Sequence, residues 1–373
     1  MQRVKRQASN NHNYFANNKK TKLIKENVTH FQDLSNDLFF EIFEYLDYFD
    51  IYQSFYDVNF NFRHLVTNSN FPIKINISTR SKWSFHRFYN HIVKHNLHRV
   101  QTMAISNVCL YDDVFSTVSN LSKITGLQTL VLEQIESKML MNLLEQLRSS
   151  TSISSISISV IEPLAHKTEI YLQLFRLSTL KFCKLSLGNY YLNQNLSLPF
   201  ATIHEQCSIE HFILMDRIFT HEIDNLLSYL PQLSRLSLRL RQNSQNERKQ
   251  SDHVLRHLTH LSIDAESIEF DGFTQMMIDL FLNIQVLNFT QSNCTNSTNE
   301  FFKATKWKQL IVSHLKNLHS FNIQLNTRVE NTDYDNQFTT SFWIERQWFI
   351  THELYSIRNS NYLNLYSIKP YKY

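Results

Sequence analysis

One short apolar phrase recurs nine times between about residues 97 and 325 and limits the folds open to this chain. The phrase is six residues long, with apolar residues at its first, fourth and sixth positions and variable residues at the other three. Successive starts lie 27, 26, 29, 27, 24, 25, 26 and 34 residues apart, so a unit of nearly constant length is repeated. The nine phrases are VQTMAI from Val100, LQTLVL from Leu127, ISSISI from Ile153, FCKLSL from Phe182, IEHFIL from Ile209, LSRLSL from Leu233, LTHLSI from Leu258, IQVLNF from Ile284 and LHSFNI from Leu318.

Each phrase predicts one β-strand, because its second and third apolar residues point to one side and the residue between them points to the other. Between phrases, MLMNLLEQL at 139–147 and DGFTQMMIDLFLNI at 271–284 have helical apolar spacing. We therefore expect each strand to return through a helix and the units to stack into a curved parallel sheet. The array resembles leucine-rich repeats, an α/β solenoid with a period of about 20 to 29 residues.

The sequence around the repeats predicts how the array begins and ends. FPIKINIS at 71–78 is typical of an edge strand, so we expect the array to cover residues 71–330. The polar segment 241–252 predicts a surface loop. Residues 331–373 contain Trp343, Trp348 and Phe349, which we interpret as a cap over the open end rather than as a ligand pocket.

Residues 34–65 contain three short helical patterns ahead of the array. In the first, apolar residues share one helical face while Glu41 and Glu44 lie on the other. Asp50 followed by Gln53 predicts a second helix that starts at Ile51. The apolar face of the first helix consists of Leu38, Ile42, Phe43 and Leu46, Ser35 to Asp37 start that helix, and the third pattern includes Phe60, Phe62 and Leu65.

A unit of about 30 residues rarely buries its own apolar side chains, so this segment predicts association with a partner surface. Residues 31–66 resemble an F-box, the module that docks a substrate receptor on the Skp-type adaptor of a cullin-RING ubiquitin ligase. Ser35 stands where the family usually has Pro, and Phe62 where it usually has Trp. The resemblance implies an adaptor-binding set of Leu34, Leu38, Ile42, Phe43, Leu46, Ile51 and Val58, with Asp50 at a helix start.

Composition argues against catalysis by the chain itself. The three glycines are isolated, so no phosphate-cradling loop can be written, and there is no GxSxG elbow. The four cysteines form no CxxC pair, so the sequence predicts neither a zinc module nor a disulfide framework. The HxxxHxxH spacings at 91–98 and 253–260 fall at different places in the repeat, and we expect no metal site and no cofactor.

Charge is concentrated at the start of the chain. Residues 1–30 carry seven basic residues and one acidic residue, a balance of +6, which leaves 4 − 6 = −2 for the remainder. We therefore expect a basic, disordered tail and a body that binds no nucleic acid. Lys5-Arg6 and Lys19-Lys20-Thr21-Lys22 resemble a bipartite nuclear-import signal. With no long apolar run, the sequence predicts a soluble chain in the cytoplasm, the nucleus or both, with no membrane contact.

The sequence also predicts where a target protein binds. The residues between the paired apolar positions, such as Ala104, Ser157 and Ser237, are mostly small and would line the inner face of the sheet. On neighbouring strands of that face we expect Arg235, Arg239, His260 and Asp264 to form a target-binding cluster, with the two guanidinium groups free to hold a carboxylate or phosphate.

Together the resemblances imply a non-catalytic, substrate-recognition subunit of an SCF-type ubiquitin ligase. Its partners would be a Skp-type adaptor, through it a cullin, and an unidentified target protein. Two alternatives stay open at this point: a repeat scaffold that binds proteins without a ligase, and a hydrolase whose catalytic residues assemble only in three dimensions.

Overall fold

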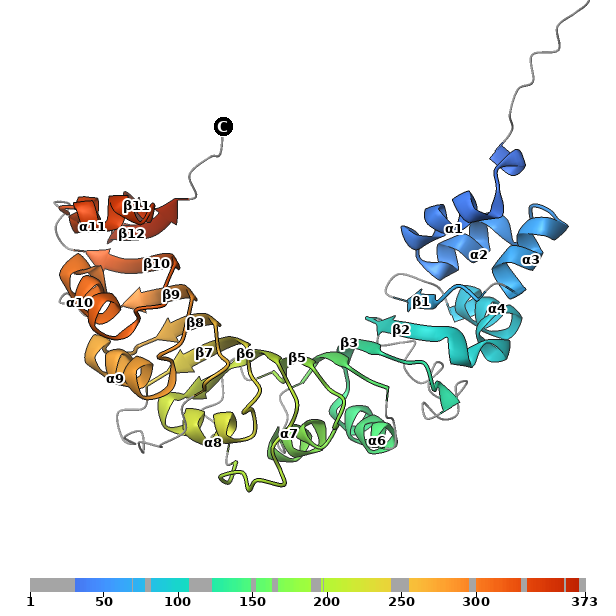
Figure 1. Cartoon of the computed structure of the whole chain (residues 1–373), viewed down its shortest axis with the longest axis horizontal. Coiled ribbons are helices and arrows are strands. Elements are labelled where there is room, and N and C mark those ends of the chain that lie inside the picture. Colours follow the sequence, from blue (N-terminus) through green and yellow to red (C-terminus); the bar gives the residue numbers. More distant parts are fainter. Residues whose placement is uncertain are drawn as a thin grey trace, which may run out of the picture.

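The computed structural model describes residues 31–68, 70–77, 82–106, 123–148, 152–162, 167–188, 196, 198–242, 255–294, 300–329, 334–358 and 360–368. Residues 1–30, positions 243–252 of the predicted surface loop and Cys109 lie outside these residues. Within them the chain forms an arc of mixed α/β structure, with strands on the inner side and α6 to α10 on the outer side (Figure 1).

One twelve-stranded sheet runs along the described part of the chain. The order is β1 to β10 as in the sequence, followed by β12 and β11. Strands β1 to β10 are parallel, and β12 and β11 pair antiparallel at the end. The strands are β1 Ile73–Asn76, β2 Val100–Ile105, β3 Thr129–Ile135, β4 Ser155–Val160, β5 Phe182–Ser186, β6 His211–Phe219, β7 Arg235–Arg241, β8 His260–Glu266, β9 Val286–Cys294, β10 Ser320–Val329, β11 Phe349–Ile357 and β12 Ser360–Ile368.

The helices cover one face of this sheet and extend its N-terminal end. The predicted helices at 139–147 and 271–284 are present as α6 and α9. The α-helices are α1 Asn36–Glu44, α2 Tyr48–Phe55, α3 Phe60–Asn68, α4 Lys82–His91, α6 Ser137–Leu147, α7 Lys167–Phe175, α8 Ile223–Ser228, α9 Phe270–Leu280, α10 Ala304–His314 and α11 Ser341–Glu345. The nine predicted repeat strands are confirmed as β2 to β10, and the predicted edge strand as β1.

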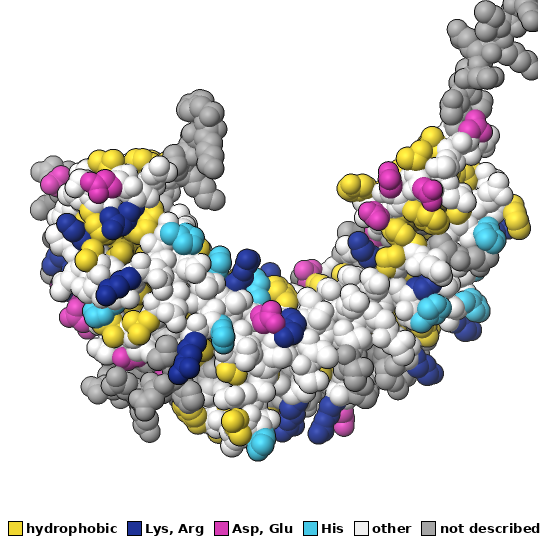
Figure 2. All heavy atoms as spheres, viewed as in Figure 1, with side chains coloured by type: hydrophobic (Ala, Val, Ile, Leu, Met, Phe, Trp, Pro, Cys, Tyr) yellow, Lys and Arg dark blue, Asp and Glu magenta, His cyan; other side chains and the backbone are white. Residues whose placement is uncertain are grey.

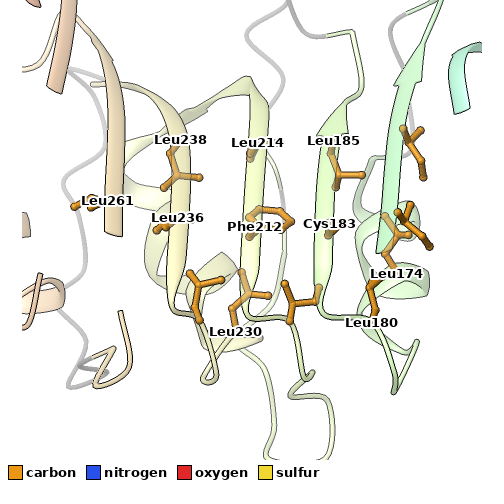
Figure 3. Packing of buried hydrophobic residues seen from close by; sticks show 14 of the residues in the cluster. Leu174, Leu180, Cys183, Leu185, Phe212, Leu214, Leu230, Leu236, Leu238 and Leu261 are labelled. Atoms are coloured by element: carbon orange, nitrogen blue, oxygen red, sulfur yellow. The ribbon is translucent and has the colours of Figure 1, made fainter. Parts of the chain in front are cut away.

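A ladder of apolar side chains runs through the core, one from each repeat. Its members occupy equivalent positions on successive strands, so each packs against the same position of the next strand, as Figure 3 shows for β5 to β7. All are buried, and burying one such side chain contributes about 1.5–3 kcal/mol. From β3 to β10 the ladder consists of Leu130, Ile156, Cys183, Phe212, Leu236, Leu261, Leu287 and Phe321.

This ladder corrects the predicted register of the fourth repeat. Cys183 pairs with Ile156 and with Phe212, so the phrase starts at Leu180 and not at Phe182. The residue between its two core positions is therefore Lys184. The two-residue error arose because the apolar alternation continues through Leu187, which is itself buried. Since strand side chains repeat every two residues, a slip of two preserves the face and leaves the pattern plausible.

Polar side chains cap the three N-terminal helices. The Ser35 hydroxyl accepts from the Leu38 amide at 3.5 Å, and Asn59 accepts from the Phe62 amide at 2.9 Å. The predicted start of the second helix at Ile51 is wrong. The helix begins three residues earlier, at Tyr48, because the Asp47 carboxylate accepts from the Phe49 amide at 2.8 Å.

A buried arginine fixes these helices on the end of the sheet. Arg99, which directly precedes β2, is only 7% exposed. Its guanidinium donates to the Tyr48 hydroxyl at 2.7 Å, to the Thr67 carbonyl at 3.1 Å and to the Phe71 carbonyl at 2.8 Å. The Tyr48 hydroxyl in turn donates to the Val66 carbonyl at 2.6 Å. One side chain therefore joins α2, the end of α3 and the linker to β1.

The C-terminal end of the sheet is closed by a different device. Trp343 and Trp348 are buried, and their rings lie 5.9 and 5.7 Å from the ring of Phe321 on β10. The β11–β12 hairpin continues the sheet beyond β10. The tryptophans are therefore core residues, whereas Phe349 is 39% exposed. The antiparallel pairing differs from the purely parallel sheet that the repeats predict.

A small charged cluster is buried near the middle of the arc. Between Ile213 and Arg217 the pairing of β6 with β7 is irregular, and Asp216 is turned inward, where it accepts from the Leu187 amide at 2.6 Å. Burial raises the pKa of the nearby Glu222 carboxyl and lowers that of Lys167. The Lys167 ammonium makes no hydrogen bond in the described structure, so it carries a desolvation cost.

Candidate functional site

The first candidate surface is apolar and lies on α1 to α3 and the turns between them. Tyr45 is 89% exposed, Phe60 77% and Val58 58%. Leu38 and Leu46 are 43% and 36% exposed. Apolar side chains gather over this horn of the arc in Figure 2. We call these five residues the helical surface. Several large apolar side chains exposed on three neighbouring helices and the turns between them are typical of an interaction site, because they stay in water unless a partner covers them.

The structure divides the predicted adaptor-binding residues into three groups. Leu38, Leu46 and Val58 belong to the helical surface. Leu34 and Ile42 are partly buried. Phe43 and Ile51 are only 1% and 0% exposed, so neither side chain is available to a partner in this structure.

The inward face of α1 explains this division. It is set by Phe39 and Phe43, which are four residues apart and pack against aromatic rings of the same unit. Two residues of the helical surface are absent from the predicted set: Tyr45, which is the C-cap of α1, and Phe60, the first residue of α3. Both lie at helix ends, where apolar periodicity gives no information about exposure.

The second candidate surface is the concave face of the sheet. In its middle, His211, Arg235 and His260 occupy equivalent positions on β6, β7 and β8. Neighbouring strands lie about 4.8 Å apart, so the three side chains form one row. Figure 2 shows histidine, basic and acidic side chains along this part of the arc. We call His211, Arg235 and His260 the basic row.

The basic row favours an anionic partner. The pKa of His211 is lowered by burial and then by the neighbouring charges of Arg235 and His260. The pKa of His260 is lowered by the same kinds of cause, burial first and then Arg235 and His319. A negatively charged group bound beside Arg235 would offset this repulsion and favour the protonated imidazoles.

The predicted target-binding cluster is assembled on one face but not with two free guanidinium groups. Arg239 donates to the Asp264 carboxylate at 2.8 Å, and next to this pair Arg217 donates to Glu266 at 2.7 Å. Arg235 is exposed and forms no ion pair among the described residues. A carboxylate or phosphate would therefore bind at Arg235. His211, which is not in the predicted cluster, lies beside Arg235 on the neighbouring strand.

Other candidate chemistry is not assembled in the described residues. His91, His95 and His98 do not share a helix, since α4 ends at His91. The His91 ring is hydrogen-bonded to the Tyr52 hydroxyl, at 2.7 Å. No group of three or more His, Cys, Asp or Glu in this part of the chain could hold a metal ion. Cys207 is buried, which raises the pKa of its thiol to about 11, so it is protonated at neutral pH.

Comparison with known proteins adds no family name. No protein-family model matches the chain, and a search of curated proteins finds no match to it. None of the helices in the described ranges combines the length and the apolar character that a membrane crossing requires. The two surfaces and the structure that holds them are therefore the features that indicate a function.

Proposed function

We propose that the chain is the substrate-recognition subunit of an SCF-type ubiquitin ligase. In this proposal α1 to α3 are an F-box that binds a Skp-type adaptor, and β2 to β10 are a leucine-rich-repeat array that binds a target protein. The observation that carries the proposal is the helical surface. Its apolar side chains are exposed at one end of the arc, on helices that buried residues hold in place.

The connection between the two surfaces supports this proposal. Arg99 bonds to groups on α2, at the end of α3 and in the linker, and it lies immediately before the first repeat strand. The Asp47 carboxylate adds a second link, since it accepts from the Asn76 amide of β1 at 2.8 Å. The helical surface and the concave face are therefore held at a fixed relative orientation.

A fixed orientation is what a receptor of this kind needs. The chain would hold the ligase core at one end and the target in the arc, which raises the effective concentration of target lysines near the conjugating enzyme. In this proposal the recruited subunits supply the catalysis, and the chain contributes position.

The proposal is tested by placing a charge on the helical surface. Leu38→Asp is expected to lower capture of a Skp-type adaptor at least tenfold, because docking would bury an unpaired carboxylate at a cost of several kcal/mol. The melting temperature should stay within about 2 °C of wild type, because Leu38 is 43% exposed. Val312→Asp is the matched control, since Val312 on α10 is 53% exposed and lies far from α1 in the sequence.

Capture should be measured with purified adaptor, and cullin should follow only when the adaptor binds. Full adaptor capture by Leu38→Asp at matched expression would overturn the F-box assignment. The remaining candidate would then be a protein-binding scaffold that works without a ligase.

A further inference from the structure

A polar hollow lies on the concave face where the parallel sheet meets the C-terminal hairpin. It has a volume of about 450 Å³, within the range of about 300–1,000 Å³ typical of ligand sites. Strands β9, β10, β11 and β12 all contribute to it. Apart from Phe289 and Ile323, its lining is polar or carries the Tyr366 ring, and it consists of Asn288, Thr290, Asn322, Gln324, Glu353, Asn364, Tyr366 and Ser367.

The hydrogen bonds of the hollow leave one side-chain acceptor, on Asn364, without a donor. The Asn322 amide donates to the Asn288 side-chain oxygen at 2.8 Å, and the Ser367 hydroxyl accepts from the Ile323 amide at 2.9 Å. Asn364 Oδ1 is buried and has no hydrogen-bond partner in the described structure. A buried acceptor without a donor costs about 1–3 kcal/mol, so a rotation of the Asn364 side chain that brings this oxygen to a donor in the hollow would be favoured.

The charge of the hollow is negative. Glu353 is exposed, lies directly opposite Asn364 in the β11–β12 register and forms no ion pair with any described residue. No Lys or Arg of the described part of the chain lines the hollow. Arg328, the basic residue of β10, is two positions beyond Asn326, the residue that pairs with Asn364. A ligand for this site must therefore bring both a positive charge and hydrogen-bond donors.

We propose that the hollow binds the guanidinium group of an arginine side chain from a bound partner protein. A guanidinium has five N–H donors in a plane and no acceptor, which matches a carboxylate beside an unpartnered amide oxygen. Tyr366 lines the same hollow, and a planar cation stacks on an aromatic ring. An ammonium lacks this planar fork and is expected to bind more weakly.

The inference rests on the proposed function only in naming a partner protein as the source of the arginine. The test uses the full chain and small probes: N-acetyl-arginine amide, its neutral isostere N-acetyl-citrulline amide, and N-acetyl-lysine amide. Binding should be followed by ligand-observed NMR titration at low salt. We expect saturable binding of the arginine probe with a Kd of about 1–10 mM and at least tenfold weaker binding of the citrulline probe.

Variants locate the site. Glu353→Gln should weaken arginine-probe binding at least tenfold, and Asn364→Asp should tighten it several-fold by adding a second carboxylate. Glu345→Gln, an exposed glutamate on α11 outside the hollow, is the matched control and should leave binding unchanged. Equal binding of the arginine and citrulline probes, full binding by Glu353→Gln, or no saturation up to about 20 mM would overturn the inference. Adaptor capture, measured separately, reports on the proposed function alone.

Discussion

The two ends of the arc solve one problem in two ways. A stacked sheet exposes core residues at its first and last strands, and both ends need a cover. At the C-terminal end the tryptophans of residues 343 and 348 and an antiparallel hairpin provide it. At the N-terminal end three helices provide it and also display Tyr45, Phe60 and Val58 to solvent. A cover requires only an apolar inner side, so the apolar outer side of these helices indicates an additional role.

The largest expected effect breaks the C-terminal cover. Trp343→Ala should destabilise this end by about 4 kcal/mol, because it empties a large core site next to Phe321 and Phe338. Hydrogen exchange should report faster opening of β10 to β12, while adaptor capture is retained. Equal loss of protection in α1 to α3 would show that the two ends unfold together and are not independent covers.

The next effect breaks the N-terminal cover. Arg99→Met should destabilise the chain by about 3 kcal/mol, because the carbonyls of Thr67 and Phe71 and the Tyr48 hydroxyl lose a charged donor. Thermal unfolding and limited proteolysis near residue 70 measure it. Arg346→Met at the other end is the control, since Arg346 is exposed and stacks on Phe342 at 4.0 Å. A similar loss in both variants would mean that Arg99 contributes no more than a surface side chain.

A third change, on the concave face between the two ends, tests whether target binding there is independent of adaptor binding at the N-terminal end. Arg235→Glu with Arg239→Glu should lower target capture at least tenfold, equivalent to about 1.4 kcal/mol, because the basic row loses its exposed cation and gains repulsive charge. Adaptor capture from the same lysate should be unchanged. If every target is retained by a folded double variant, recognition lies elsewhere on the chain.

The smallest effect should be stabilising. Lys167→Met removes a buried ammonium without a hydrogen-bond partner, and because its desolvation outweighs its attraction to Asp216 and Glu222, stability should rise by about 1 kcal/mol at neutral pH. The pKa of Lys167 is lowered in the fold, so the cost of its charge is present below the folded pKa. It fades as pH rises towards the ordinary lysine value. The advantage of the methionine variant in thermal melts should therefore shrink with rising pH, and a constant advantage would contradict the desolvation argument.

The repeat pattern predicted much of the fold for a physical reason. A strand buried on one face must alternate, and nine alternations at one period leave few arrangements other than a stacked sheet. The alternation could not fix the register of the fourth repeat at Cys183, because a shift of two residues keeps the same side chains on the buried face of the strand. It also missed the antiparallel hairpin, since strand direction depends on the connection and not on alternation.

The candidate sites were harder to predict than the fold. The periodicity of α1 identified a face but could not show whether Phe43 points to a partner or into the unit. The concave cluster was placed correctly in register, yet the pairing of Arg239 with Asp264 depends on side-chain geometry. The hollow around Glu353 and Asn364 had no sequence signal, because its residues come from four strands that meet only in space.

The stacking of each strand on its neighbours also bears on how the chain is made. Residues that pair between repeat strands, such as Leu236 and Leu261, are separated by about one repeat in a chain of 373 residues, so contacts in the array are local in sequence. Such an array can nucleate at one place and grow by adding repeats. Synthesis delivers α1 to α3 first, and Arg99 follows 99 − 68 = 31 residues after the end of α3. The N-terminal cover can therefore form on the ribosome before the later strands exist, and it supplies the template on which they add.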